Sequence, residues 1–308
     1  MKQTPNTVMM MRPVRFGFNE QTAGSNAFQS AETSLSVDEI QERALAEFDA
    51  FVARLRAHGV KVMVVQDTPE PHTPDSIFPN NWISFHEDGR VVLYPMMADN
   101  RRQERRMDVF TQLQEEFGFR IQQIIDVTDN ENQGEIVEGT GSIIFDYPHQ
   151  LAYANRSDRT TEKLFFQICE RLGFEGILFD ALDKDGNTIY HTNVVMALGD
   201  KFAVICGDVI PTDQERELVF EKLRNSGHEI VTISYDQMIA FAGNMLQVEN
   251  EKGETFLLMS QSSFDVLTAT QKATLEKYTN LLPMNVNTIE QFGGGSVRCM
   301  VAGVHLPK

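Results

Sequence analysis

Five segments of the chain share one hydrophobic pattern, in which polar or glycine residues lead into a short apolar run typical of a β-strand. These segments are residues 78–85, 138–145, 191–198, 243–248 and 295–301. One polar residue from each segment gives the series Asn81, Glu138, His191, Asn244 and Cys299, whose steps are 57, 53, 53 and 55 residues. Such even spacing predicts a structural unit that is repeated along the chain.

The residues after each segment also recur. A turn rich in Gly, Asp or Pro leads to a second apolar run, then to a helical pattern and then to another strand pattern. The second apolar runs are residues 90–95, 150–154, 201–205 and 254–259. The helical patterns cover residues 100–117, 158–172, 212–226 and 268–277. The closing strands are predicted at residues 121–127, 176–179, 229–234 and 285–289. Each unit therefore has the order ββαβ.

The fifth unit is split between the two ends of the chain. Its second strand, helix and third strand are predicted at residues 7–18, 37–58 and 61–66, while its first strand lies near residues 301–306. We therefore predict an α/β ring of five ββαβ modules that forms a single domain over residues 1–308, because no module buries its own apolar face. An ordinary two-domain α/β protein is the alternative. The modules cover approximately residues 67–127, 128–180, 181–235, 236–290, and 291–308 completed by 1–66.

The composition narrows the classes of function. The 308 residues contain no apolar run near 18 residues, so no transmembrane helix is predicted, and the first residues lack the apolar core of a signal peptide. Three widely spaced cysteines argue against a disulfide framework and favour a cytoplasmic location. The net charge of −17 argues against nucleic acid or an anionic membrane as a partner, and it is compatible with a small cationic or zwitterionic substrate.

The last segment carries the most reactive candidate residue. Cys299 follows three glycines, residues 293–295, and stands beside Arg298. Glycine lets the backbone approach another group closely, and a neighbouring cation would favour the thiolate, which is the reactive form of cysteine. The alternative is a cysteine buried on a strand. Cys169 lies in a helical pattern and Cys206 at the end of a predicted strand, and we assign both to packing.

Equivalent positions of the modules in a ring face one axis, so the five residues of the series would converge there. A cysteine, a histidine and a carboxylate then supply a nucleophile, a proton carrier and an orienting acid. Each residue alone has an ordinary interpretation, since a histidine or glutamate is usually solvated and an asparagine often belongs to a turn. Their common place in the repeat favours catalysis by Cys299, His191 and Glu138.

Four separated motifs carry a resemblance to a known superfamily. They are EGTGSIIFD at Glu138, YHTN at His191, SDRT at Ser157 and the terminal GGGSVRCM. They resemble the guanidine-modifying enzymes of the pentein fold, which include arginine deiminases, dimethylarginine dimethylaminohydrolases, glycine amidinotransferases and succinylarginine dihydrolases. Within these, the chain looks closest to the bacterial amidinotransferase-like group described as citrulline-utilisation hydrolases. The resemblance implies a pentein fold, a five-fold pseudo-symmetric α/β propeller, and a covalent mechanism.

The resemblance also implies roles for individual residues. Cys299 matches the nucleophile, His191 the general acid/base, and Glu138 the acid paired with that histidine. Arg159 matches the arginine that anchors a substrate α-carboxylate, for which its planar guanidinium is suited. Asp75, in the sequence PDSIF, matches a polar substrate-contact position that is Asp in the dimethylarginine enzymes.

The sequence departs from the superfamily at positions that would grip a cationic head group. Acids are usual at the positions of Asn81 and Asn193, and one is frequent at Gly141. A buried guanidinium without carboxylates is poorly compensated, whereas amides suit a neutral ureido group. Succinylarginine dihydrolases, which handle a ureido intermediate, also have an Asn-Asn pair in this region. The predicted substrate-binding set is therefore Asp75, Asn80, Asn81, Arg159, Asn193 and Asn244.

These observations predict a hydrolase that cleaves a terminal C–N bond of a ureido or guanidino amino acid, with citrulline as the favoured substrate. The alternatives are an arginine deiminase-like or dimethylarginine-type hydrolase, an amidinotransferase, and a non-catalytic pentein ring that only binds a partner. No spacing of cysteines and histidines indicates a metal site, and the covalent route requires no cofactor. A homodimer is expected from base rates alone.

Overall fold

Five sheets of three strands each make up the β-structure in a computed structural model that describes all residues 1–308. The sheets have the strand orders β15-β1-β2, β3-β4-β5, β6-β7-β8, β9-β10-β11 and β12-β13-β14. The strands are β1 (Thr7–Arg12), β2 (Lys61–Gln66), β3 (Ile83–Phe85), β4 (Arg90–Leu93), β5 (Gln123–Asp126), β6 (Ile144–Asp146), β7 (Leu151–Asn155), β8 (Glu175–Phe179), β9 (Met196–Leu198), β10 (Phe202–Ile205), β11 (Glu229–Thr232), β12 (Leu246–Glu249), β13 (Thr255–Ser260), β14 (Asn280–Met284) and β15 (Ala302–Val304).

All five sheets have the same internal topology. The middle strand pairs antiparallel with the strand before it and parallel with the strand after it; for example, Phe145 lies opposite Ala152, and Tyr153 pairs with Ile177. A parallel pair needs a long crossover, and each crossover here contains a helix. The predicted α/β class and the ββαβ order of the units are confirmed.

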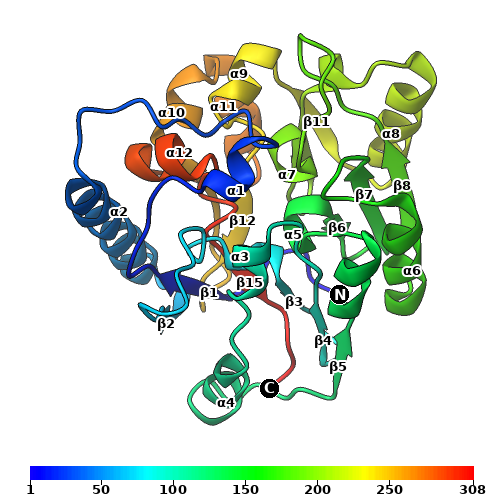
Figure 1. The fold of residues 1–308 in the computed structure, drawn as a ribbon. Helices are drawn as coiled ribbons and strands as arrows, with labels where there is room; N and C mark the ends of the chain where they lie inside the picture. Colours follow the sequence, from blue (N-terminus) through cyan, green and yellow to red (C-terminus); the bar gives the residue numbers. More distant parts are fainter.

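The sheet β15-β1-β2 joins the two ends of the chain. Met9 of β1 lies opposite Ala302 of β15 in an antiparallel pair, and Met9 also pairs with Met63 of β2 in parallel register. Both chain ends consequently lie on the same side of the molecule (Figure 1). This connection closes the ring of sheets without a separate terminal module.

The longer helices lie on the outside of the ring, as α2, α6 and α8 show in Figure 1. Many short helical turns lie near the middle of the ring. The helices are α1 (Glu20–Ala23), α2 (Val37–Ala57), α3 (Asp99–Arg102), α4 (Asp108–Glu115), α5 (Gly139–Ser142), α6 (Glu162–Leu172), α7 (Thr192–Val195), α8 (Asp213–Asn225), α9 (Tyr235–Ile239), α10 (Gln261–Val266), α11 (Ala269–Glu276) and α12 (Asn287–Gly293), with 3-10 turns η1 (Pro79–Asn81), η2 (Thr128–Gln133) and η3 (Gly207–Val209).

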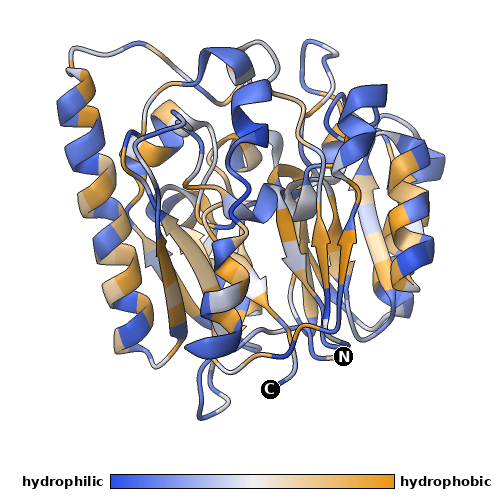
Figure 2. Ribbon diagram, turned by 60° about the horizontal axis from the view of Figure 1, so that its bottom comes forward, coloured by the Kyte–Doolittle hydropathy of each residue, from blue (hydrophilic) through white to orange (hydrophobic).

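Amphipathic helices cover the sheets. Helix α2 begins with a capping box between Ser36 and Glu39, which satisfies free backbone N–H groups at its start. Its buried residues recur at helical spacing and are Ile40, Ala44, Phe48, Phe51, Val52 and Leu55. Figure 2 shows the same division of the molecule, with apolar residues concentrated on the strands and polar residues on the outer helix faces. None of the helices combines the length and the apolar character needed to span a bilayer.

Two predicted elements are wrong. The strand predicted at residues 285–289 is instead a short loop followed by the start of helix α12 at Asn287, and the strand of that module is β14, at Asn280–Met284. Pro283 interrupts this apolar run in the sequence, but β14 is an edge strand, where a missing N–H is tolerated. The single helix predicted at residues 100–117 is divided into α3 and α4, because residues 103–107 leave the helical conformation.

Candidate active site

Short helical turns, rather than the strands themselves, carry the candidate catalytic residues. Glu138 is the N-cap of α5 and His191 is the N-cap of α7, and each turn leads directly into the first strand of its sheet. Asn81 ends the 3-10 turn η1, while Asn244 and Cys299 lie in the turns that precede β12 and β15. The sequence pattern predicted that these residues lie on the first strands. The structure places them instead in the turns just before those strands.

His191 and Glu138 form a buried pair. The Nε2 atom of His191 lies 2.9 Å from Oε2 of Glu138, and the backbone N–H of Met97 donates to Oε1 at 3.0 Å. Burial opposes ionisation of Glu138, but the nearby Arg159 and the hydrogen bond from His191 outweigh burial and hold the pKa of Glu138 far below its ordinary value. The geometry therefore assigns the proton to Nε2 and leaves Nδ1 of His191 as a base.

Burial controls the charge of His191. It lowers the pKa of His191 to about 4, against the opposing effect of Glu138. The imidazole is thus neutral near pH 7, and its Nδ1 atom makes no hydrogen bond in the structure. A neutral imidazole whose Nε2–H is held by a carboxylate is suited to accept a proton from a thiol or from water.

Two asparagine amides surround the sulfur of Cys299. The Nδ2 atoms of Asn193 and Asn244 each lie 3.3 Å from Sγ. The Asn244 amide is itself fixed, because its Nδ2 also donates to the Asn193 carbonyl at 2.9 Å and its Oδ1 accepts from the Arg298 N–H at 3.0 Å. These N–H groups would solvate negative charge on the sulfur as it develops.

Arg298 does not provide the contact that the sequence suggested. Its guanidinium donates to the Val301 carbonyl at 3.0 Å and lines a different cavity with Tyr147 and His305. Burial lowers the pKa of Arg298, and the charge of Cys299 opposes this effect. The side chains of residues 298 and 299 leave the turn in different directions, so the direct partners of the sulfur are amides and the arginine acts on it only at longer range.

Arg101 is a central residue that the sequence pattern did not single out. Its Nε and Nη2 donate to the two carboxylate oxygens of Glu104 at 2.9 and 3.0 Å, and its Nη1 donates to Oδ1 of Asn81 at 3.0 Å. The same guanidinium lies 3.8 Å from Asp75 and 3.9 Å from Glu138. Burial raises the pKa of Glu104 to about 8, and Arg101 opposes this effect.

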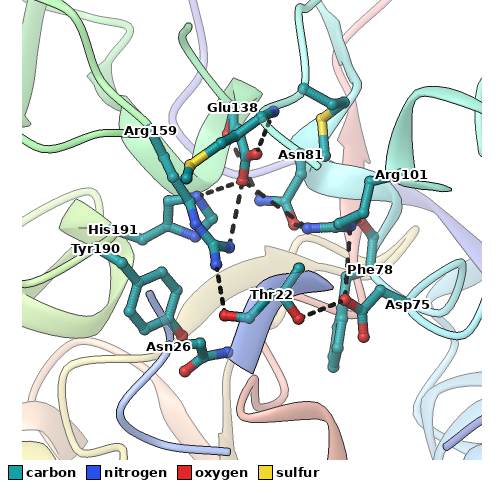
Figure 3. Close-up of polar contacts among 12 residues, drawn as sticks. Thr22, Asn26, Asp75, Phe78, Asn81, Arg101, Glu138, Arg159, Tyr190 and His191 are labelled. Carbon is teal, nitrogen blue, oxygen red and sulfur yellow. Dashed lines mark hydrogen bonds and ion pairs between the residues drawn. The ribbon is translucent and has the colours of Figure 1, made fainter. Parts of the chain in front are cut away.

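Arg159 also approaches Glu138, from the left in Figure 3, whereas Arg101 lies to the right. Its Nη1 lies 3.5 Å from Oε2 of Glu138, and its guanidinium carbon is 5.0 Å from the centre of the Tyr190 ring. Its Nη2 donates to Oγ of Ser25 at 2.6 Å and to the Thr22 carbonyl at 3.4 Å. The buried Nε–H of Arg159 has no hydrogen-bond partner.

The remaining predicted residues differ in their placement. Asp75 lines the cavity beside Cys299; its Oδ2 accepts from Asn19 at 2.7 Å, and its Oδ1 is buried without a partner. Asn81 also lines this cavity. The side chain of Asn80 is buried without any hydrogen bond and does not line the cavity.

Glycine is required where the turns pack closely. A Cβ atom at Gly141 would lie 2.3 Å from Nδ2 of Asn81 and 2.9 Å from the His191 ring. No side chain fits there, so this departure from the acid frequent in the superfamily follows from the packing. Gly294 has φ near +60° and lies against Asn26, which explains a glycine in the run before Cys299.

The cavity itself is small and covered. It is lined by residues that include Asp75, Asn81, His191 and Cys299 and has a volume of about 20 Å³, which is room for little more than one water molecule. The segment after α1 covers it: Asn26 donates to the carbonyls of Gly293 and Gly294 at 3.4 and 3.3 Å. The cavity as it stands in the structure is too small to hold an amino acid.

Comparisons with known proteins agree with this architecture. A family model described as N,N dimethylarginine dimethylhydrolase, eukaryotic, matches residues 12–306. A search of curated proteins found no match. Three solved structures illustrate the likeness, which at these identities establishes the pentein fold. ArgZ, an arginine dihydrolase from cyanobacteria, has a TM-score of 0.75 at 17% identity over 98% of this chain and 41% of its own. Unliganded AgrE gives 0.73 at 16% identity over 96% and 38%. DDAH from Pseudomonas aeruginosa, a mutant complexed with citrulline, gives 0.65 at 14% identity over 97% and 99%.

Proposed function

The chain belongs to the N,N-dimethylarginine dimethylhydrolase family, within the guanidine-modifying superfamily of the pentein fold, and on this premise we propose that it is a cysteine-dependent hydrolase. Its substrate is a ureido or guanidino amino acid, and we favour citrulline. The chain spans about 41% of full-length ArgZ, so the proposal concerns only the reaction of the pentein unit.

One observation carries the choice of substrate: three buried polar atoms around the site have no hydrogen-bond partner. They are Oδ1 of Asp75, Nε of Arg159 and Oδ1 of Asn193. Buried polar groups are normally paired, so these atoms define what a ligand must offer. A carboxylate would pair with Arg159, an ammonium with Asp75, and a terminal N–H with Asn193, which together describe an amino acid whose side chain ends in an N–H donor, as ureido and guanidino groups both do.

The polar groups near the sulfur favour a neutral head group over a cation. Asn81, Asn193 and Asn244 are amides, and Glu138 is already engaged by His191 and Arg159. A guanidinium brought here would be desolvated, and the carboxylate with an unpaired oxygen, Asp75, is already assigned to the substrate ammonium, so the cation would be poorly compensated. The neutral ureido group needs only donors and acceptors, and amides supply both.

In the proposed reaction, His191 accepts and returns each proton that is transferred. Nδ1 of His191 takes the thiol proton of Cys299, the thiolate forms a C–S bond to the ureido carbon, and the C–N bond to the terminal nitrogen breaks as His191 returns the proton to release ammonia. Water, deprotonated by His191, then attacks the S-carbamoyl adduct, the C–S bond breaks, and the thiol regains its proton. The carbamate that leaves decomposes to carbon dioxide and the amine.

A second candidate is a hydrolase of methylated arginines. The family model that matches residues 12–306 favours it, as does the unpartnered Oδ1 of Asp75, which would accept from a substituted guanidinium. The two candidates share the nucleophile and the base and differ in the charge of the substrate head group.

Steady-state assays decide between the candidates. Ammonia and amine products would be measured with citrulline, arginine, asymmetric dimethylarginine and succinylarginine, with Cys299→Ser as the inactive control. We expect citrulline to give the highest kcat/KM, together with ornithine as a product. A kcat/KM for arginine or dimethylarginine several orders of magnitude above that for citrulline would contradict the proposed substrate, and transfer to an added amine acceptor would indicate an amidinotransferase.

A further inference from the structure

A second cluster of ionisable side chains lies outside the cavity beside Cys299, at the other end of the first strand of the module that carries Glu138. Glu138 precedes β6, whereas Asp146 is the last residue of that strand. His149 follows Asp146 in the turn between β6 and β7, and His228 lies between α8 and β11 of the neighbouring sheet. One ligand atom from each of the three residues can be chosen so that all lie within 4.8 Å of one another.

The distances within this cluster are close to those of a metal site. Nδ1 of His149 lies 2.8 Å from Oδ1 of Asp146, and Nδ1 of His228 lies 3.9 Å from Oδ2. Ligands of a tetrahedral zinc ion are separated by about 3.3 Å, given bonds of about 2.0 to 2.1 Å. Nδ1 of His228 also lies 2.8 Å from Oγ of Ser226. To bind an ion, the His228 imidazole would exchange this contact for the metal and move closer to Asp146, while the His149 imidazole would move slightly away from it.

The unpaired oxygen of Asp146 is an independent indication of a ligand. Asp146 is fully buried, and its Oδ2 atom has no hydrogen-bond partner. No lysine or arginine pairs with this carboxylate, and the ionisable groups within 4 Å of it are the two histidines. A buried carboxylate that is left half-satisfied is costly, and a cation between its free oxygen and the imidazoles would remove that cost.

From this arrangement we propose that Asp146, His149 and His228 bind one divalent transition-metal ion, for which zinc is the best match. Two imidazoles and one carboxylate are ligands that zinc favours, and a fourth position remains for water. The side chain of His149 is 39% exposed, whereas that of His228 is 1% exposed, so an ion can enter from the solvent side past His149.

The site would join two modules of the ring. Asp146 and His149 belong to the sheet β6-β7-β8, whose first turn carries Glu138, and His228 belongs to the sheet β9-β10-β11, whose first turn carries His191. An ion bound here would fix these two modules to each other at the end opposite the candidate active site. No residue of this cluster lines the cavity beside Cys299, so the ion would act on the packing of the two modules.

The sequence pattern gave no indication of this site. Asp146 and His149 are three residues apart in a turn, but His228 is 79 residues further along the chain than His149 and does not belong to any ligand spacing of the usual kind. Only the packing of the two sheets brings it to the carboxylate.

The test is zinc binding by the full chain carrying Cys299→Ser, so that a zinc–thiolate contact at the active site does not contribute. Titration of the metal-free protein with Zn²⁺ in a calorimeter should give one site per chain, and Co²⁺ in its place should give the absorption bands of tetrahedral coordination. Added zinc should also raise Tm, since it binds only the folded chain. Absence of saturable zinc binding would overturn the proposal.

His149→Ala is the decisive variant, because His149 is exposed and its loss leaves the fold intact. Loss of a residue that only hydrogen-bonds a metal ligand lowers metal affinity by about 10- to 100-fold, and loss of a ligand itself should lower it at least as much. Asp146→Asn should have a similar effect while retaining the shape of the side chain. His72→Ala removes another exposed histidine and should leave zinc affinity unchanged. Equal zinc affinity in His149→Ala and the parent protein would refute the assignment.

Discussion

The substitution Asn81→Asp tests whether the amides of the site select an uncharged substrate. Asn81 is 2% exposed and lines the cavity with Cys299, and its Oδ1 accepts from Nη1 of Arg101 at 3.0 Å. An aspartate of the same shape keeps this contact and adds one negative charge beside the position of the substrate head group. We expect the variant to gain activity on arginine relative to citrulline.

The size of the change follows from the neighbours of Asn81. A hydrogen bond to a charged group contributes about 1.5 to 3 kcal/mol, which corresponds to about a tenfold to hundredfold change in kcat/KM. Arg101 already lies beside the new carboxylate and neutralises part of its charge. The ratio of kcat/KM for arginine to that for citrulline should therefore rise by about tenfold, at the lower end of this range.

The assay is steady-state ammonia release with both substrates for the parent protein, Asn81→Asp and Asn285→Asp. Asn285 is exposed, so its substitution adds the same charge at a distance from the site and should leave the ratio unchanged. Thermal unfolding of each variant confirms that it is folded. A ratio that stays constant in a folded Asn81→Asp variant would refute the argument from the asparagines.

Three further substitutions or conditions test the rest of the site and its surroundings. Glu138→Gln removes the carboxylate 2.9 Å from His191 Nε2, and kcat should fall by about 10²- to 10⁴-fold with a smaller change in KM, as steady-state kinetics will show. Iodoacetamide near neutral pH should label one thiol per chain, and none in Cys299→Ser, because burial raises the pKa of Cys169 to about 12 and that of Cys206 to about 11. Mass spectrometry of the peptides identifies the labelled cysteine, and a labelled Cys169 would contradict the prediction. Burial lowers the pKa of His86 from 6.5 to about 4. The stability that its neutral form provides is therefore complete above pH 6.5 and is lost as the pH falls towards 4, by about 3 kcal/mol in the free energy of unfolding. Urea unfolding between pH 7 and pH 4 should show this loss, and His86→Gln should reduce it.

The fold could be predicted largely from the sequence because the repeated module produces a repeated pattern of polar and apolar residues along the chain. Each module buries its apolar face against its neighbours, and this requirement places similar apolar runs at similar intervals. The spacing of Asn81, Glu138, His191, Asn244 and Cys299 follows from it, since each residue occupies the turn before the first strand of its sheet. The turns themselves were not predicted, because a four-residue helix such as α5 has no periodicity of its own.

The residues that the sequence did not indicate are those whose role depends on burial alone. Arg101 lies in a run with three other arginines, at residues 102, 105 and 106, and nothing in the pattern distinguishes the buried arginine from the others. His228 is likewise one of seven histidines and acquires its partners only when two sheets pack together. Hydrophobic periodicity reports which face of an element is buried, but a polar side chain that is buried for function breaks this rule.

The charges around Cys299 are balanced before any substrate enters, and this limits what can bind. Burial raises the pKa of Glu104 to about 8, so this carboxyl is mostly protonated near pH 7. The two other buried carboxylates, Asp75 and Glu138, are then matched by two arginines, Arg101 at 3.8 Å from Asp75 and Arg159 at 3.5 Å from Glu138. A zwitterionic amino acid with an uncharged end would add no net charge to this arrangement. Arginine would add one positive charge, and the carboxylate with an unpaired oxygen, Asp75, is the one proposed to bind the substrate ammonium. The cost of an unpaired buried charge is several kcal/mol, so the ion pairs that hold the site together also favour a neutral head group.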